Sequence, residues 1–164
     1  PVIVALDQVQ DSGNVGTLAR TLYALGGAGL ILMRHRAAAL GHRAHKAAAG
    51  ALSNLPVARL HNMARFLTSC QEGNMAVYYA GTDDTCQSIF SVSLSWPAVL
   101  VLGNEEKGVR PLVAKSCQTG VTLPMAGCFD SLNVAQAGSM LLTEFLRQHL
   151  TGQKTEYRGQ KTED

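Results

Sequence analysis

Residues 99–109, VLVLGNEEKGV, contain the pattern that decides the fold class. Four apolar residues lead into Gly103, and a short acidic turn then ends at Gly108. Such an apolar run is typical of a strand that is buried on both faces of a parallel sheet. Two glycines beside two adjacent carboxylates exceed what helix capping requires. We therefore interpret the turn as backbone shaped around a ligand; the alternative is an ordinary strand-to-helix turn.

Similar apolar runs recur along the chain and alternate with segments of helical length. The predicted strands are residues 2–6, 29–33, 57–60, 75–80, 98–102 and 120–123. The predicted helices lie near residues 15–25, 44–52, 63–71, 109–116 and 131–150. This alternation predicts an α/β fold, with a mostly parallel sheet flanked by helices. We expect one domain over residues 1–150 and a polar, disordered tail over 151–164.

Composition narrows the function classes. The chain has 164 residues, 46% of them hydrophobic and 16% charged, which is globular in character. Its formal net charge is only +2, so any affinity for RNA must come from a local patch or another domain. The low charge also indicates apolar surface reserved for a partner such as a second copy. No apolar run approaches the roughly 18 residues that a membrane span needs.

Cysteine and histidine spacing argues against disulfides and metals. Cys70, Cys86, Cys117 and Cys128 form no CxxC pair, which predicts reduced thiols in a cytoplasmic protein. The pair of His42 and His45 has no cysteine or acidic partner at zinc spacing, so we expect no metal. Because no signal peptide precedes the first strand and the chain opens on Pro1, we expect an excised domain whose upstream part is missing.

Polar residues also follow the first predicted strand, in residues 7–20, DQVQDSGNVGTLAR. Asp11 and Asn14 are suited to capping a helix. Gly16 and Arg20 are four apart and share a helix face, so a large group would approach at Gly16 while Arg20 reaches over it. A capped helix with a solvated arginine is an equally good interpretation of this loop alone.

A third polar stretch follows the last predicted strand, in residues 123–135, LPMAGCFDSLNVA. Ser131 would cap the final helix, and Asn133 would project into a site. Met125 and Leu132 would supply apolar walls suited to an adenine ring. Taken structurally, Ser131 is simply a good helix cap. Ligands in an open α/β sheet bind at the carboxyl ends of strands, which is where all three stretches would lie.

A basic cluster follows the second predicted strand, near the same sheet edge as the helix that carries Arg20. Its members are Arg34, His35, Arg36, His42, Arg43, His45 and Lys46. Lys107 and Arg110 would extend it from the acidic turn. Phosphate contacts that steer RNA to the site are one interpretation, and a solvated loop is the other.

Taken together and in this order, the three stretches resemble the SpoU–TrmH family of RNA ribose 2′-O-methyltransferases, in the SPOUT class. The first motif of the family is matched by Asn14, Gly16 and Arg20. The second motif is matched by Gly103, Asn104, Glu105 and Gly108. The third motif is matched by Pro124, Met125 and residues 131–135. The resemblance spans roughly residues 2–148.

The resemblance implies a SPOUT fold whose C-terminal part forms a deep trefoil knot, which pattern reasoning would not propose. It implies S-adenosylmethionine as cofactor and a homodimer that completes the site across its interface. The cofactor contacts would be Gly81, Leu102, Gly103, Leu123, Met125, Ser131 and Leu132. The catalytic residues would be Asn14, Arg20, Glu105, Ser131 and Asn133. The RNA contacts would be Arg20, Arg34, Arg36, Arg43, Lys46 and Lys107.

The implied reaction is methylation of a ribose 2′-hydroxyl in tRNA or rRNA. Arginine is effectively always protonated, so we expect Arg20 to grip a phosphate and polarise the hydroxyl, while Asn14 and Asn133 orient these groups. Glu105 would restrain an arginine or accept a hydrogen bond. One alternative is a non-catalytic RNA-binding protein that keeps the fold. Another, a dinucleotide-dependent oxidoreductase, lacks the required GxGxxG after the first strand.

Overall fold

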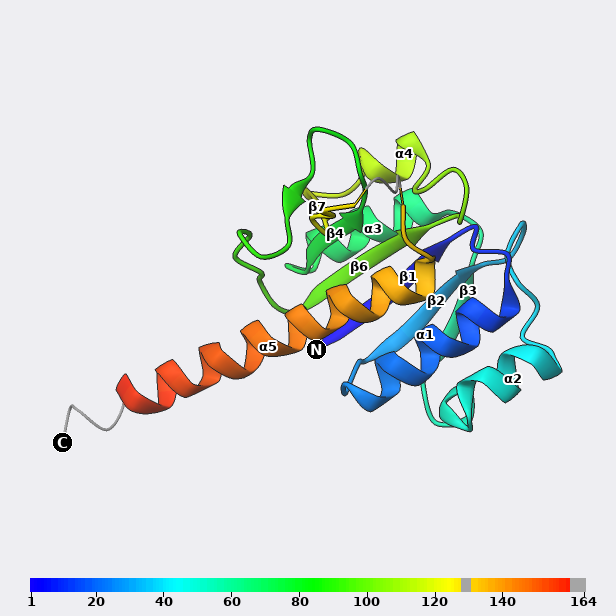
Figure 1. The fold of residues 1–164 in the computed structure, drawn as a ribbon, viewed down its shortest axis with the longest axis horizontal. Coiled ribbons are helices and arrows are strands. Elements are labelled where there is room, and N and C mark those ends of the chain that lie inside the picture. Colours follow the sequence, from blue (N-terminus) through cyan, green and yellow to red (C-terminus); the bar gives the residue numbers. More distant parts are fainter. Residues whose placement is uncertain (128–130, 160–164) are drawn as a thin grey trace.

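A seven-stranded sheet forms the centre of the computed structural model (Figure 1), with the strand order β3-β2-β1-β6-β4-β7-β5. Every neighbouring pair is parallel. The structure describes residues 1–127 and 131–159, with side chains as far as residue 152. The predicted α/β class with a parallel sheet is therefore confirmed.

Six of the seven strands agree closely with the prediction. They are β1 (Val2–Asp7), β2 (Gly29–Met33), β3 (Val57–Leu60), β4 (Ala76–Ala80), β6 (Ala98–Gly103) and β7 (Thr119–Thr122). The sequence did not indicate β5 (Gln87–Ser88), a two-residue strand at the sheet edge that pairs with β7. β2 and β6 are buried along their whole length, which explains why these two central strands are continuous apolar runs.

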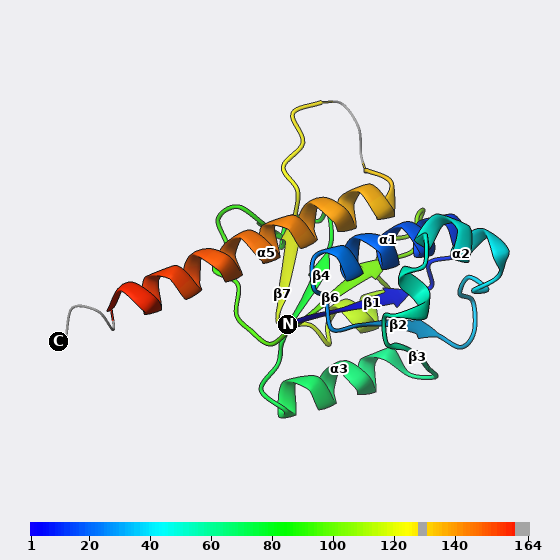
Figure 2. The ribbon, with the colours of Figure 1, turned by 90° about the horizontal axis from the view of Figure 1, so that it is seen from below.

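Helices cover both faces of the sheet. They are α1 (Ser12–Ala24), α2 (His42–Ala48), the 3₁₀ helix η1 (Ala51–Ser53), α3 (Met63–Glu72), α4 (Pro111–Ala114) and α5 (Val134–Gly159). Figure 2 shows α1, α2 and α5 on one face and α3 on the other. Val113 of α4 packs in the same core as Met63 and Leu67 of α3, so α4 also covers the second face.

The larger core lies between the sheet and the pair α1 and α5. Leu18 and Leu22 of α1 and Phe145 of α5 pack there against Leu100 and Leu102 of β6, and all are at most 1% exposed. Each such side chain contributes about 1.5–3 kcal/mol when it leaves water. This packing fixes the start of α5 against the carboxyl end of β6, where the polar stretches meet.

The last helix begins later than predicted, because Asn133 rather than Ser131 caps it. The Asn133 Oδ1 accepts hydrogen bonds from the backbone N–H groups of Ala135, at 2.9 Å, and Gln136, at 3.3 Å. Helix α5 then continues to Gly159, into the segment 151–164 for which the sequence indicated no regular structure. Residues 160–164 lie outside the described part.

Gly16 serves helix packing and not ligand access, contrary to the prediction. A Cβ at this position would lie 2.2 Å from the backbone oxygen of Ala44 in α2. Gly16 is buried, whereas Arg20 on the next turn is exposed. The glycine is therefore required because α1 and α2 approach closely.

Three of the four cysteines lie in the described part of the chain. Cys70, Cys86 and Cys117 are free thiols, and Cys128 lies outside the described residues. Within residues 1–127 and 131–159, no helix combines the length and apolar character needed to cross a bilayer. In the same residues, no group of three or more histidine, cysteine or acidic side chains is placed to hold a metal ion.

Candidate active site

The turn after β6 is closed by hydrogen bonds within its own backbone. Asn104 and Gly108 exchange backbone hydrogen bonds of 3.0 and 2.9 Å, and Gly108 has a φ of +66°. A Cβ on Gly103 would lie 2.0 Å from the carbonyl carbon of Gly108. The two glycines therefore let this loop close on itself. Both also line a cavity, so the interpretation of the turn as backbone shaped around a ligand stays a prediction.

Glu105 holds this loop against the segment that follows β1. Its Oε1 accepts hydrogen bonds from the backbone N–H of Asp11 and the Nδ2 of Asn14, both at 3.2 Å. Its Oε2 accepts from the backbone N–H of Gln10 at 3.3 Å and from Asn104 Nδ2 at 3.4 Å. Of the two roles predicted for Glu105, it therefore takes that of hydrogen-bond acceptor.

Asn14 connects Glu105 to the start of α5. While its Nδ2 donates to Glu105, its Oδ1 accepts from the Nδ2 of Asn133 at 3.1 Å. The Oδ1 of Asn133 is already occupied by the first turn of α5, so its amide group has only Nδ2 to offer. Because each amide can satisfy its partners in one orientation only, the chain Glu105–Asn14–Asn133 is directional. It joins the three polar stretches at one point.

An ion pair between the buried Asp7 and the partly exposed Arg110 holds the other end of the loop. The carboxylate of Asp7, which is 0% exposed, accepts from the guanidinium of Arg110 at 2.6 to 3.1 Å and from its backbone N–H at 3.0 Å. The sequence had suggested Arg110 as part of an RNA-binding patch, but its guanidinium is hydrogen-bonded to Asp7.

Burial, together with the nearby Asp7 charge, raises the pKa of the Cys117 thiol to about 12.

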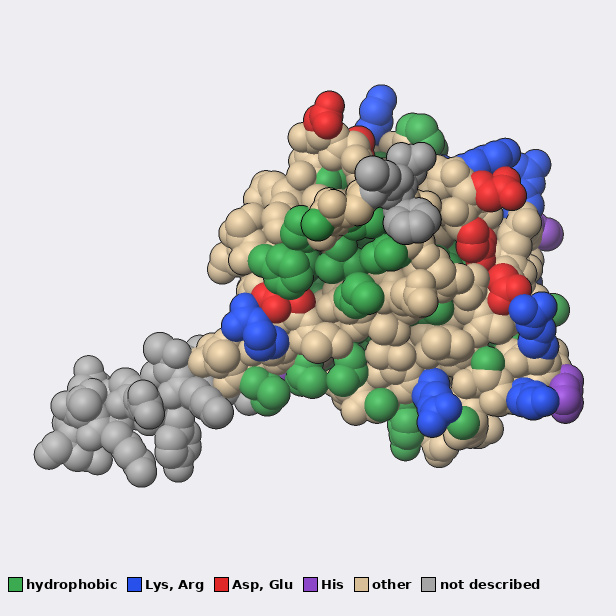
Figure 3. All heavy atoms as spheres, in the orientation of Figure 1, with side chains coloured by type: hydrophobic (Ala, Val, Ile, Leu, Met, Phe, Trp, Pro, Cys, Tyr) green, Lys and Arg blue, Asp and Glu red, His purple; other side chains and the backbone are tan. Residues whose placement is uncertain are grey.

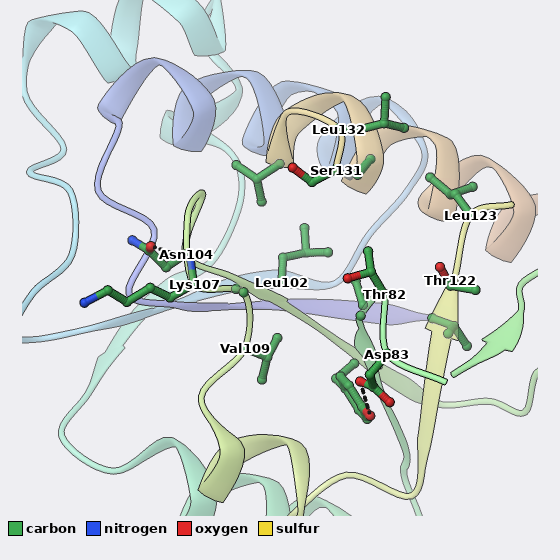
Figure 4. A pocket seen from close by; sticks show the side chains of 18 of the residues that line it. Thr82, Asp83, Leu102, Asn104, Lys107, Val109, Thr122, Leu123, Ser131 and Leu132 are labelled. Atoms are coloured by element: carbon green, nitrogen blue, oxygen red, sulfur yellow. Dashed lines mark hydrogen bonds between the residues drawn. The ribbon is translucent and has the colours of Figure 1, made fainter. Parts of the chain in front are cut away.

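A cavity of about 590 Å³ opens at the carboxyl ends of β6, β4 and β7 (Figure 4). Its apolar lining includes Leu102, Leu123 and Leu132, and its polar lining includes Asn104 and Ser131. All residues that the sequence predicted as cofactor contacts line it, namely Gly81, Leu102, Gly103, Leu123, Met125, Ser131 and Leu132. The predicted segment's residues 128–130 lie outside the described chain.

Sequence reasoning missed the polar residues that follow β4. Thr82 and Asp83 line the same cavity. The Asp83 Oδ1 accepts from the hydroxyl and, at 3.0 Å, from the backbone N–H of Thr85. Its Oδ2 accepts from the Tyr79 hydroxyl at 3.3 Å. The Thr85 hydroxyl, followed by its N–H, lowers the pKa of Asp83, which is therefore a carboxylate near neutral pH. Their place directly after a predicted strand was the only available signal.

A family model described as the SpoU rRNA Methylase family matches residues 1–143 of this chain. The chain belongs to the SpoU rRNA methylase family. Its relatives include the 23S rRNA (guanosine-2′-O-)-methyltransferase RlmB of Haemophilus influenzae, 35% identical over 92% of this chain and 61% of that protein. The resemblance stated from the three motifs is thus confirmed.

Solved structures of SpoU proteins have the same fold. A putative RNA methyltransferase of the TrmH family from Porphyromonas gingivalis matches with a TM-score of 0.82 and 34% identity, over 90% of this chain and 59% of that one. The SpoU methyltransferase AviRb from Streptomyces viridochromogenes, in complex with AdoMet, matches with a TM-score of 0.82 and 27% identity over 90% and 57%. The present chain spans about half the length of its curated relatives.

Of the basic residues predicted to contact RNA in this SpoU chain, Lys107 lines the cavity and the others lie outside its lining. Figure 3 shows Lys and Arg side chains along one edge, over α2 and the loop after β2, while hydrophobic side chains gather nearer the centre beside β7. Arg36 and Lys107 line a small hollow next to the Glu105 loop. Arg43 pairs with Asp11 at 2.9 Å. Arg34, Lys46 and Arg20 are exposed, and Arg20 does not line the cavity of its own chain.

Proposed function

We propose that this chain is the catalytic domain of an S-adenosylmethionine-dependent enzyme that methylates a ribose 2′-hydroxyl in tRNA or rRNA. One observation carries the proposal: the cavity is bordered by Glu105, whose carboxylate holds Asn14 and, through it, Asn133. A ligand pocket and a polar constellation from three distant segments thus meet at one sheet edge. The printed names of the SpoU relatives support the same reaction class.

The cavity suits the cofactor in size and chemistry. Its volume of about 590 Å³ lies within the range typical of small-molecule sites. Leu123 and Leu132 offer apolar surface for a flat ring, and Gly81 and Gly103 expose backbone groups. When bound, S-adenosylmethionine supplies a methyl group on a positive sulfonium, which is a good electrophile. We assign cofactor contacts to Gly81, Leu102, Gly103, Leu123, Met125, Ser131 and Leu132.

The chain itself must align the ribose hydroxyl with the methyl group, while the hydroxyl proton leaves to the RNA phosphate or to water. We assign this work to Arg20, Asn14 and Asn133, with Glu105 and Ser131 holding the surrounding loops. Arg20 stays charged and would bind an RNA phosphate while polarising the hydroxyl. It lies outside the lining of its own chain's cavity, so the proposal requires a second copy of the chain to bring an Arg20 to the site.

A homodimer is therefore part of the proposal. Tyr23 on α1 is 49% exposed and Met140 on α5 is 52% exposed, and these two helices pack side by side. Large apolar side chains exposed on neighbouring helices are typical of surface that a partner covers. Light scattering should give twice the chain mass of 17.4 kDa. A mass near 17.4 kDa at every accessible concentration would contradict the dimer.

RNA would approach over the basic edge. We propose that RNA phosphates are bound by Arg34 and Arg36 after β2, by Arg43 and Lys46 of α2, and by Lys107 beside Glu105. The formal net charge of +2 is small for a nucleic-acid binder. We propose that a further RNA-binding segment outside this chain contributes affinity, that residues 1–150 form the catalytic domain, and that residues 151–164 do not take part in catalysis.

The topology of the C-terminal third is proposed to be the trefoil knot of the SPOUT fold. In the strand order β1-β6-β4-β7, β6 lies between β1 and β4. After β7, helix α5 returns to pack on α1. A chain that crosses back in this way allows the segments around the cavity to be threaded through one another. Slow, multi-step refolding from denaturant would agree with a threaded chain, and refolding within milliseconds would contradict it.

Transfer of tritium from labelled S-adenosylmethionine to RNA tests the proposed function. The full-length protein should label RNA extracted from a strain that lacks its gene, and nuclease digestion should then yield 2′-O-methylated nucleotides. RNA binding without transfer, under conditions in which the cofactor binds, would mean a non-catalytic RNA-binding protein. A rise in melting temperature with NAD but not with S-adenosylmethionine would indicate an oxidoreductase instead.

A further inference from the structure

The order of the strands divides the cavity into three zones. Along its carboxyl edge the sheet runs β1, β6, β4 and β7. Glu105, which holds Asn14 and through it Asn133, lies at the β1 and β6 end. The apolar residue Leu123 lies at the other end, after β7. Between the two ends lie Thr82 and Asp83, which follow β4 (Figure 4).

The proposed cofactor has three parts in a matching order. Adenine is apolar and flat, the ribose carries two neighbouring hydroxyls, and the sulfonium with its methyl group comes next. If the methyl group must reach the catalytic end and the adenine occupies the apolar end, the ribose lies over β4. We propose that Asp83, assisted by Thr82, binds the ribose hydroxyls of the cofactor, an inference that rests on the proposed function.

The chemistry of Asp83 suits two neighbouring hydroxyls. An ionised carboxylate accepts hydrogen bonds only, and a ribose diol offers two donors. Acidic side chains at a neighbouring strand end bind ribose in the same manner in dinucleotide-binding α/β proteins. The Thr82 hydroxyl, which both donates and accepts, completes the pair.

The surroundings of Asp83 hold one oxygen firmly and leave the other available. Oδ1 is engaged by the hydroxyl and N–H of Thr85. The contacts to Oδ2 are longer, at 3.3 Å from the Tyr79 hydroxyl and 3.4 Å from the Cys86 thiol. A ligand hydroxyl forms a stronger bond than either, because O–H···O⁻ bonds are shortest at about 2.5–2.7 Å. Oδ2 is therefore the atom that we assign to the ribose.

Calorimetric titration of the full-length protein with S-adenosylhomocysteine and its 2′-deoxy and 3′-deoxy analogues tests the inference. Asp83→Asn keeps an oxygen for Thr85 and removes the second acceptor. It should weaken binding of S-adenosylhomocysteine by about 10-fold or more, as expected for a hydrogen bond to a charged group. Thr82→Val should weaken binding less. Asp84→Asn, the adjacent exposed carboxylate that does not line the cavity, should bind like wild type.

The deoxy analogues make the test specific. At least one of them should bind wild-type protein about 10-fold more weakly than the parent ligand, and this penalty should disappear in Asp83→Asn. An unchanged penalty in Asp83→Asn, or parent-ligand affinity within 2-fold of wild type, would overturn the inference. If Asp83→Asn weakens S-adenosylhomocysteine but not 5′-methylthioadenosine, the carboxylate binds the amino-acid end, which also overturns it.

Failure of the proposed function gives a different result. In that case neither the wild-type protein nor Asp83→Asn binds S-adenosylhomocysteine or S-adenosylmethionine. Should Asp83→Asn fold poorly, as judged by its melting temperature, Thr82→Val measured with the same ligands decides the question. Loss of the deoxy penalty in that variant supports the shared ribose site, and wild-type behaviour with every analogue counts against it.

Discussion

The side chains of Asn14 and Glu105 are hydrogen-bonded, with 3.2 Å between Nδ2 and Oε1, although they are 91 positions apart in the chain. This bond ties the first turn of α1 to the loop that borders the cavity. Asn133 extends it to the first turn of α5. The three segments singled out from the sequence therefore share one hydrogen-bond chain, and its members depend on one another.

Asn14→Asp should reduce methyl transfer more than Asn14→Ala. The new carboxylate would face Glu105 with no donor between them, whereas alanine only removes the link. We expect a loss of about 10²-fold or more in kcat for Asn14→Ala, as for other positioned groups, with little change in cofactor affinity. Gln10→Ala is the control, since Gln10 contacts Glu105 through its backbone alone. Equal activity of Asn14→Ala and Gln10→Ala would remove Asn14 from the mechanism.

Arg20→Ala should abolish most methyl transfer without affecting stability or cofactor binding. Because Arg20 is exposed and does not line the cavity, its loss should change unfolding free energy by less than about 0.5 kcal/mol. Methyl transfer should fall by about 10²-fold or more if it aligns phosphate and hydroxyl. Arg20→Lys keeps the charge but loses the planar fork and should remain defective. Arg65→Ala, an exposed arginine on α3, is the control; matching turnover in both variants would refute the role.

Arg110→Ala should be destabilising, because the buried Asp7 carboxylate keeps only the backbone N–H of residue 110 and loses its charged partner. We expect a loss of about 1.5–3 kcal/mol in unfolding free energy, measured by denaturant titration. Adding Asp7→Asn should recover part of this loss, since it removes the stranded charge. Arg43→Ala breaks the exposed pair with Asp11 and should cost at most about 1 kcal/mol. Equal losses for the two arginines would show that burial of Asp7 does not matter.

Glu144→Gln should destabilise the protein near neutral pH but not in acid. Hydrogen bonds from Arg147 lower the pKa of Glu144 below its ordinary value of 4.5. The stabilisation is therefore present above pH 4.5 and is lost as the pH falls through the lowered pKa. At pH 7 the variant should lose about 1–2 kcal/mol of unfolding free energy. Melting temperatures against pH check this, with Glu72→Gln, an exposed carboxylate, as control. A difference from wild type that does not shrink as the pH falls below 4.5 would contradict it.

The sequence alone determined the α/β class, most strand positions and the family. The apolar runs at β1, β2 and β6 were legible because strands buried on both faces need no polar residues. Three ordered motifs sufficed for the family, and all predicted cofactor contacts do line one cavity. These features could be predicted from the sequence because each depends on residue types at short spacings along the chain.

Only the tertiary structure decided what these residues contact. It showed that Gly16 lies too close to the backbone of Ala44 for any side chain, and that Gly103 packs against Gly108. It also showed that Arg110 forms an ion pair with Asp7. It also brought Asp83 to the cavity, where nothing in its local pattern had marked it. Such pairings join residues far apart in the chain. They depend on strand order and helix packing, which fix distances that no local spacing encodes.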